Sequence, residues 1–291
     1  MRFEISHRTT YRYSEAVVQS QHVIHLAARS TRHQSTHRHS LIIEPAPTFR
    51  HDASDAFANP VTMIEIELPH QDLVIHSRAI IETARAVAVD EAGTMPWDRL
   101  DEALYGGAGS IDLDVVQFRC PSQQTSPTLG IADYAAQSFL PGRPVIEASR
   151  DLMGRIHHDF TFDATATDVS TPITQVFAQR RGVCQDFAHL ALACLRALRV
   201  PARYVSGYIL TRPPPGQPKL QGADASHAWI DVWSPEYGWL GLDPTNAIAA
   251  GEEHIIIANG REYNDVSPIS GVLLGGGEHT VGVSVDVIVA A

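Results

Sequence analysis

The stretch from residue 180 to residue 204, RRGVCQDFAHLALACLRALRVPARY, constrains the fold of this chain more than any other. Apolar residues at helical spacing, from Phe187 to Leu198, predict a helix with a broad buried face, and Pro201 ends that helix. The helix begins next to Cys184. The domain that contains this segment is therefore expected to be built around a buried helix with a cysteine at its amino end.

Cys184 occupies the first turn of this predicted helix. Unpaired N–H groups and the positive end of the helix dipole stabilise a thiolate at that position, and Arg180 and Arg181 add positive charge just upstream. These features favour a reactive thiol. The alternative is a small core residue, because cysteine is often fully buried. Cys194, which lies in the middle of the helix among leucines, fits that core role.

Outside this helix the chain divides into β-rich and helical stretches. Residues 1–90 hold short segments rich in β-branched and aromatic residues, separated by Pro and Asn-Pro, and predict an all-β, sandwich-like domain. Residues 91–128 lose that pattern and are expected to connect two domains. Residues 129–291 begin with helical segments and continue as strands. They predict an α+β domain, a helix cluster followed by an antiparallel sheet that takes in the last strands of the chain.

Composition narrows the class of protein. Apolar residues make up 44% of the 291 residues, and 33 acidic against 22 basic residues give a net charge of −11. This balance is typical of a globular protein and argues against nucleic acid or an anionic membrane as the partner. No window approaches 18 uninterrupted apolar residues, and the N-terminus has no apolar signal segment, so we expect a cytoplasmic protein without a membrane span.

The sequence offers only weak candidates for metal binding. Three cysteines without a CxxC pair argue against both a disulfide framework and a zinc site built on thiolates. The histidine-rich stretch STRHQSTHRHS alternates along a predicted strand, where a solvated polar face is the simpler interpretation. No metal site is therefore predicted.

A cysteine nucleophile needs a base, and the base needs a group that orients it. The segment SHAWIDVWSPEYGWLGLDPTN, residues 226–246, predicts two strands joined by a loop at SPE. If Trp233 pairs with Tyr237, His227 lies directly opposite Asp243, with Cβ atoms about 5 Å apart. The carboxylate would then fix the imidazole tautomer. A slip of one residue would turn Asp243 to the other face, and a surface histidine with a turn aspartate is the alternative.

The segment before this histidine, TRPPPGQPKLQGADAS at residues 211–226, is long for a connection inside a compact domain. Its position suggests a flap over the active site. A stiff polyproline loop on the surface is the alternative interpretation.

Three ordered blocks resemble a known family. GVCQDFAHLALACLRALRVPARYVSGYI, GADASHAWIDVW and GWLGLDPTN are similar to the catalytic core of the transglutaminase-like superfamily, and most of all to bacterial transglutaminase-like cysteine peptidases. YRYSEAVVQSQH, LIIEPAP and DAFANPV resemble the β-rich domain that precedes this core, and GREYNDVSPISG resembles a block near the family's C-terminus. The resemblance implies a papain-like core behind an N-terminal β domain.

The resemblance also implies a catalytic triad, with Cys184 as nucleophile, His227 as base and then acid, and Asp243 as orienting group. Such a triad cleaves a peptide or amide substrate through a thioester and requires neither metal nor organic cofactor. We therefore expect a cysteine peptidase or amidase. Transfer of the acyl group to an amine is one alternative, and a catalytically idle peptide-binding protein is another.

Further residues are candidates for the site. The backbone N–H of Cys184 is the expected first oxyanion donor, because it lies at a helix N-terminus. The second donor stays open, and its candidates are Gln175, Gln179 and Gln185. The candidates for substrate binding are Trp229, Asp186, Tyr263 and Asp265. Two of these have structural alternatives: Trp229 could fill the core, and Asp186 could bond the first amides of the helix.

Overall fold

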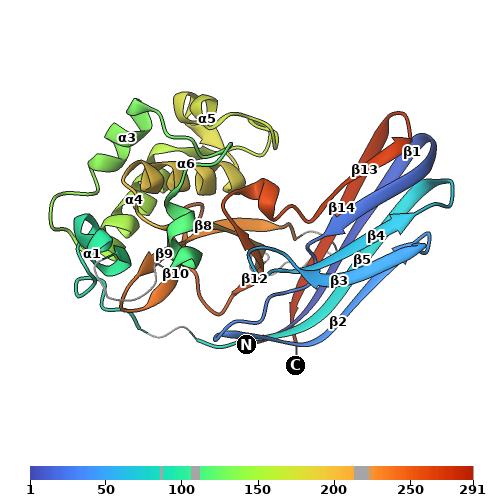
Figure 1. Cartoon of the computed structure of the whole chain (residues 1–291), viewed down its shortest axis with the longest axis horizontal. Helices are drawn as coiled ribbons and strands as arrows, with labels where there is room; N and C mark the ends of the chain where they lie inside the picture. Colours follow the sequence, from blue (N-terminus) through green and yellow to red (C-terminus); the bar gives the residue numbers. More distant parts are fainter. Residues whose placement is uncertain (86–87, 106–111, 213–221, 223, 291) are drawn as a thin grey trace.

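A computed structural model describes residues 1–85, 88–105, 112–212, 222 and 224–290. Figure 1 shows a curled β-sheet on one side of the molecule and a mixed core of helices and strands on the other. The two chain ends lie close together, because strands from both ends pair with each other. In the described part of the chain no helix has both the length and the apolar character that crossing a membrane requires.

The curled sheet is a half-barrel in which every pairing is antiparallel. Its strands are β1 (Arg2–Ile24), β2 (Gln34–Glu44), β3 (Phe49–Ser54), β4 (Pro60–Ile66), β5 (His70–Thr83), β13 (Ile269–Gly275) and β14 (His279–Val289). β1 runs through the whole sheet: its first part pairs with β5 and β14, and its last part with β4 and β13. The pairing of β1 with β5 shifts register between Arg12 and Val17, which lets the strand bend.

The half-barrel matches the predicted all-β region, and it is one sheet curled on itself. Apolar side chains of β1, β2, β4 and β5 fill its inside, among them Val17, Ile64 and Ile75. β13 and β14 differ from the prediction, which placed the last strands of the chain in the sheet of the second domain. They pair with β1 instead, so the half-barrel takes strands from both ends of the chain. No local sequence pattern indicates such a distant partner.

The second part is a five-stranded antiparallel sheet with helices packed against it. Its strands follow the order β11-β10-β9-β8-β12, with β8 (Ala202–Ile209), β9 (His227–Ser234), β10 (Gly238–Asp243), β11 (Ile248–Ala249) and β12 (His254–Gly260). The longer helices are α3 (Leu129–Ala136), α4 (Val145–Asp159), α5 (Ile173–Gln179) and α6 (Cys184–Ala197). α6 is buried from Asp186 to Arg196 and contacts β8, β9, α3, α4 and α5. The predicted central helix is therefore present.

The segment between these parts is not a bare linker. It holds η1 (Trp97–Arg99), α1 (Leu100–Tyr105), α2 (Leu113–Val116) and η2 (Gln117–Arg119). Three short elements complete the described part of the chain, and these are β6 (Thr161–Phe162), β7 (Arg181–Gly182) and η3 (Tyr263–Asp265).

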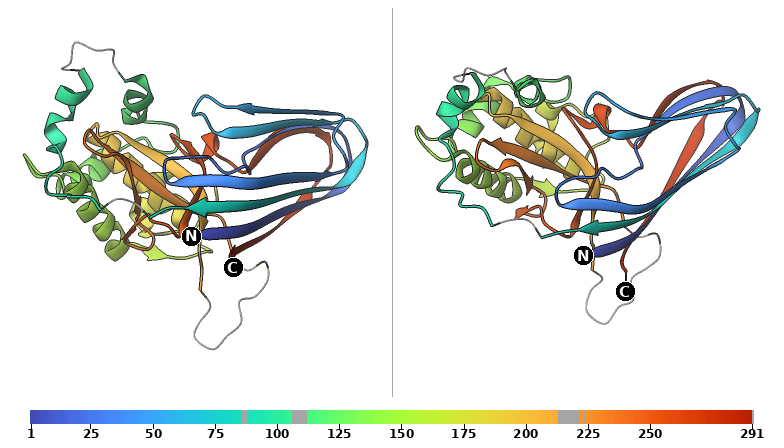
Figure 2. Two further views of the ribbon diagram at one scale, coloured as in Figure 1. Left: turned by 90° about the horizontal axis from the view of Figure 1, so that it is seen from below. Right: turned by 60° about the horizontal axis from the view of Figure 1, so that its bottom comes forward.

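The half-barrel is fixed to the second part by a shared apolar core and by hydrogen bonds from two side-chain amides. Phe3, Ile81 and Val285 of the half-barrel belong to the same apolar cluster as Tyr208 and Ile230 of the five-stranded sheet. Figure 2 shows the two parts side by side from two further directions. This common core holds the half-barrel against the helical part as one unit.

The edge strand β12 is covered by side-chain amides. Asn59 donates to the carbonyl of Asn259 and accepts its N–H, both at 2.8 Å. Gln34 does the same with Ile256, at 2.7 and 2.8 Å. In each of these two amide clamps, one N–H and the C=O of the side-chain amide face the strand, so the amide pairs with a peptide as a neighbouring strand would.

Candidate active site

The start of α6 positions Cys184 through a buried carboxylate. Oδ2 of Asp186 accepts the backbone N–H of Val183 at 2.8 Å and the hydroxyl of Thr167 at 2.6 Å. Burial raises the pKa of Asp186, while these two hydrogen bonds act against the rise. A Cβ on Gly182 would lie 2.7 Å from Oδ2 of Asp186, so only glycine fits there. Asp186 therefore bonds the helix entry, the structural alternative raised for it above.

His227 and Asp243 come together at the end of the β9–β10 hairpin. His227 Nε2 lies 2.7 Å from Asp243 Oδ2. The predicted register was wrong by two residues, because Trp233 pairs with Trp239. The loop is PEY, and Gly238, which has a φ of +72°, follows it and closes the hairpin. A shift of two residues keeps every side chain on its face of the sheet, so the two groups still meet.

Asp243 is fully buried and surrounded by hydrogen-bond donors. Its Oδ2 accepts from His227, from Asn246 Nδ2 at 2.7 Å and from His254 Nε2 at 3.3 Å. Its Oδ1 accepts the backbone N–H groups of Thr245 at 2.9 Å and of Asn246 at 3.2 Å. Burial alone would raise the pKa of Asp243, but hydrogen bonds from His227 and His254 outweigh burial and hold this pKa far below its usual range. The carboxylate is therefore ionised at neutral pH.

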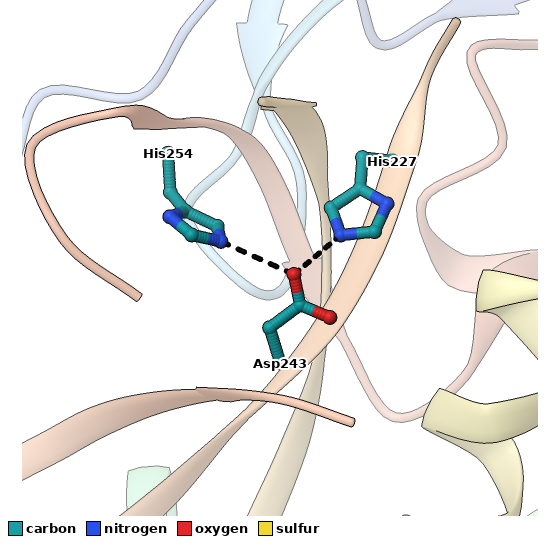
Figure 3. A group of neighbouring side chains, drawn as sticks. All are labelled: His227, Asp243 and His254. Atoms are coloured by element: carbon teal, nitrogen blue, oxygen red, sulfur yellow. Dashed lines mark hydrogen bonds and ion pairs between the residues drawn. The ribbon is translucent and has the colours of Figure 1, made fainter. Parts of the chain in front are cut away.

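His254 is a member of this group that the sequence analysis missed. It begins β12, and Figure 3 shows its ring and that of His227 on either side of Asp243 Oδ2. His254 Nδ1 accepts the N–H of Gly251 at 3.2 Å, so its proton lies on Nε2, which donates to Asp243. Trp229 packs against both rings, with centroids 5.1 Å from His254 and 6.0 Å from His227. The sequence around His254 shows only a strand.

The other side of the His227 ring faces Cys184. Nε2 of His227 bonds Asp243, which leaves Nδ1 for the thiol. Burial would lower the pKa of His227, but hydrogen bonds to Asp243 and Cys184 outweigh burial and raise this pKa to about 9. His227 is therefore mostly protonated at neutral pH. An imidazole beside a thiol is the partner that activates a cysteine nucleophile.

Cys184 and His227 open into a cavity of about 340 Å³ between the two parts of the molecule. The core contributes Val183, Gln185, Tyr204 and Tyr263 to its lining, among others, and the half-barrel contributes His7, Thr9, Tyr11, Val281 and Val283. The lining in the described residues has no carboxylate, lysine or arginine. Burial lowers the pKa of His7 to about 4, so this wall is neutral at pH 7. Apart from the pair of Cys184 and His227, the cavity therefore offers an uncharged surface.

The remaining predicted residues divide between this cavity and other places. Tyr263 and Gln185 line the cavity, and Gln175 and Gln179 do not. Trp229 lines a different and larger cavity of about 590 Å³, which reaches His254 and not Cys184. Choosing the larger of these two cavities would therefore place the candidate site away from Cys184.

Two other predictions concern the surroundings of the cavity. Asp265 bonds the side chain and backbone of Arg261 and lies outside the lining of the Cys184 cavity. Most of the predicted flap, residues 213–221 and 223, lies outside the described residues.

One group in the described residues has the spacing of metal ligands. The ligand atoms of His227, Asp243 and His254 lie within 4.8 Å of one another. They are already bonded to each other, and Nε2 of His254 carries a proton, which leaves it no lone pair for a metal. The arrangement fits a hydrogen-bonded triad with an additional histidine better than a metal centre.

Two families match the chain. The bacterial transglutaminase-like N-terminal region matches residues 3–82, and the transglutaminase-like superfamily matches residues 133–244. An uncharacterized protein of Mycobacterium tuberculosis is 39% identical over 99% of this chain and 92% of its own length. A protein-glutamine gamma-glutamyltransferase of Pseudomonas aeruginosa is 32% identical over 41% of this chain and 18% of its own length.

The fold has a solved counterpart. The crystal structure named "a Putative Cysteine Protease from Cytophaga hutchinsonii" covers 100% of this chain and 92% of that chain, with a TM-score of 0.75 and 21% identity. At this identity the likeness concerns the fold, and it includes both the half-barrel and the core. Together with the two family matches and the full-length relative, it shows that the chain belongs to the transglutaminase-like superfamily, with the bacterial transglutaminase-like N-terminal region ahead of the core.

Proposed function

We propose that this chain is a cysteine-dependent amidase or peptidase, with Cys184 as nucleophile, His227 as acid and base, and Asp243 as the orienting carboxylate. One observation carries the proposal: a buried, ionised Asp243 holds His227 at 2.7 Å, and the opposite side of that imidazole meets Cys184 at the start of α6. Nucleophile, base and orienter in this order are what covalent catalysis by a thiol requires.

Acylation begins with attack of the Cys184 thiolate on the carbonyl carbon of an amide. The new C–S bond converts the carbonyl oxygen into an oxyanion, for which the backbone N–H at the start of α6 is the proposed donor. Collapse of this intermediate breaks the C–N bond. His227 gives its Nδ1 proton to the departing amine, and a thioester on Cys184 remains.

Deacylation reverses the proton transfer. His227, now neutral, takes a proton from water, and the hydroxide attacks the thioester carbonyl. The C–S bond breaks, the carboxylic acid leaves, and the thiolate beside protonated His227 is restored. Asp243 keeps its charge throughout, which stabilises the imidazolium in both halves of the cycle.

Transfer of the acyl group to an amine is the second candidate. The relative from Pseudomonas aeruginosa, which is named a protein-glutamine gamma-glutamyltransferase, favours it over part of the core. The two activities share the thioester and differ only in whether water or an amine attacks it. Hydrolysis is our preferred assignment.

The test is a screen of the purified protein against a library of peptides and isopeptides, with a labelled primary amine present and Cys184→Ala as the control. We expect free carboxylic acid as the main product and no product with the variant. Incorporation of the amine faster than hydrolysis would assign transamidation instead. If Cys184→Ala gives the same products as the parent protein, the catalytic role of this thiol is wrong.

A further inference from the structure

β14 presents a strand edge beside the nucleophile. Among the described strands it pairs with β1 alone, so one of its sides faces away from the half-barrel sheet. Val281 and Val283 of this strand line the cavity that holds Cys184 and His227. Backbone groups on such an edge are a ready template for another extended chain.

The outward backbone groups of β14 belong to its odd-numbered residues. The N–H of Asp224 donates to the carbonyl of Val285 at 3.1 Å, and the N–H of Val287 donates to Oδ2 of Asp224 at 2.8 Å. Val285 and Val287 therefore point their backbone groups away from β1. Backbone groups alternate between the two sides of an antiparallel strand, so Val281 and Val283 also face outward.

One end of this edge already has a strand-like partner within the chain. Asp224 forms an antiparallel bridge with Val285, and two residues later Ser226 lines the cavity together with Val283. In the described residues the pairing ends there, because the chain turns into β9 at His227. The bridge shows that the edge accepts a partner and sets its antiparallel direction. Continued toward His279, the same pairing passes beside Cys184.

The two faces of β14 differ in character. Val281 and Val283 give the cavity face an apolar surface. On the opposite face Arg8 and Arg12 line a shallow groove together with threonine and serine of β14. The lining of this groove in the described residues holds these two guanidinium groups and no carboxylate, so the groove is positive, although the exposed Asp72 lies 3.8 Å from Arg12. An extended peptide alternates its side chains in the same way.

We propose that β14 docks the substrate as an extended peptide that pairs antiparallel with residues 279–283 and presents alternate side chains to Cys184. The backbone groups of Val281 and Val283 bond the peptide. Its side chains on the cavity face are uncharged, and those on the other face are acidic and meet Arg8 and Arg12. This inference rests on the proposed function, because it assumes that Cys184 is the reacting group.

The test compares two probes that alkylate a thiol. One is a seven-residue peptide of alternating Val and Glu whose central residue carries a chloroacetamide on its side chain. The other is that central residue alone, capped at both ends. The second-order rate of Cys184 labelling is measured by mass spectrometry. Two main-chain hydrogen bonds predict labelling by the peptide that is roughly tenfold faster or more.

Backbone methylation is the matched control. N-methyl groups on one set of alternate residues of the peptide block the N–H groups that face β14, and N-methyl groups on the other set do not. The first set should abolish the faster labelling of Cys184 by the peptide relative to the single-residue probe, and the second set should preserve it. Val283→Pro removes one outward N–H of β14 and should bring the ratio of the two rates toward one. If that variant does not fold, the methylated peptides still decide.

Three results would overturn the docking proposal. These are equal labelling by the two probes, an equal effect of both methylation sets, and a dimer in sedimentation that Val283→Pro dissociates. Such a dimer would mean that β14 pairs with a second copy of the chain. Failure of the proposed function has a different signature, because neither probe would then label Cys184 faster than the exposed Cys120.

Discussion

The Nε2 atom of His254 donates to Oδ2 of Asp243 over 3.3 Å. This contact ties the orienting carboxylate to β12, which lies at the far edge of the sheet from β10. A carboxylate held by only one strand could rotate with its own side chain. With donors on both sides of Oδ2, Asp243 keeps one orientation, and His227 keeps the ring position that faces the thiol (Figure 3).

Replacement of His254 by alanine should therefore weaken the site without removing the nucleophile. A hydrogen bond to a charged group contributes about 1.5–3 kcal/mol, so we expect alkylation of Cys184 by iodoacetamide at pH 7 to slow by about tenfold. His37→Ala, which removes an exposed histidine bonded to Glu82 on the half-barrel, is the control and should leave the rate unchanged. An unaltered rate in His254→Ala would mean that the other donors suffice to orient Asp243.

The raised pKa of His227 makes stability depend on pH. Because its pKa is about 9 in the folded protein against 6.5 as the ordinary value, folding favours the protonated ring. This contribution is fully present below pH 6.5 and is lost as the pH rises through 9. Asp243→Asn removes the charge that holds the proton, so the loss of stability between pH 6.5 and 9 should become smaller. Urea unfolding at several pH values, with NMR titration of the His227 ring, measures both effects.

The NMR titration also gives the outcome that would contradict this account. If the ring of His227 titrates near 6.5 in the parent protein, Asp243 does not stabilise the imidazolium. The same titration in Cys184→Ala separates the two partners, because the hydrogen bond to Cys184 also raises this pKa. We expect an intermediate value in that variant.

The contact of His227 with Asp243 was predicted correctly from the sequence, although the predicted register of the hairpin was wrong. The register of the hairpin was wrong by two residues, yet side chains alternate with a period of two, so an even slip leaves both groups on one face. The signal for the correct loop was present in Gly238, which follows PEY directly and whose positive φ suits a residue that closes a hairpin loop. An odd slip would have destroyed the prediction.

Contacts between distant parts of the chain could not be predicted in this way. His254 joins Asp243 from another strand, and the half-barrel supplies Tyr11 and Val283 to the cavity from opposite ends of the chain. Periodicity reports which face of an element is buried, and it carries no information on which element covers that face. The wall of the cavity opposite Cys184 therefore had no counterpart in the sequence analysis.

The amide clamp that Asn59 forms on β12 predicts that the loss of this one side chain lowers the stability of the protein substantially. Asn59 is fully buried, and its truncation to alanine leaves the N–H and C=O of Asn259 without their partner. A buried group left unsatisfied costs about 1–3 kcal/mol, so the free energy of unfolding in urea should fall by about that amount or more. Asn264→Ala, whose side chain bonds only Glu262 among the described residues, should change it by less than about 0.5 kcal/mol. Equal effects of the two substitutions would show that the clamp does not stabilise the edge.

The substitution Gly182→Ala tests whether the packing of Asp186 against Gly182 fixes the start of α6. A Cβ at this position would lie 2.7 Å from Oδ2 and 2.8 Å from Cβ of Asp186, so in Gly182→Ala either the carboxylate or the helix entry must move. Overpacking of this kind costs about 1–3 kcal/mol, and displacement of Cys184 should slow its alkylation as well. Gly154→Ala is the matched control, because Gly154 lies inside α4 with open space at its Cβ, and helix propensity predicts a gain of about 0.5–1 kcal/mol. A Gly182→Ala protein as stable and as reactive as the parent would mean that Asp186 yields without moving the thiol.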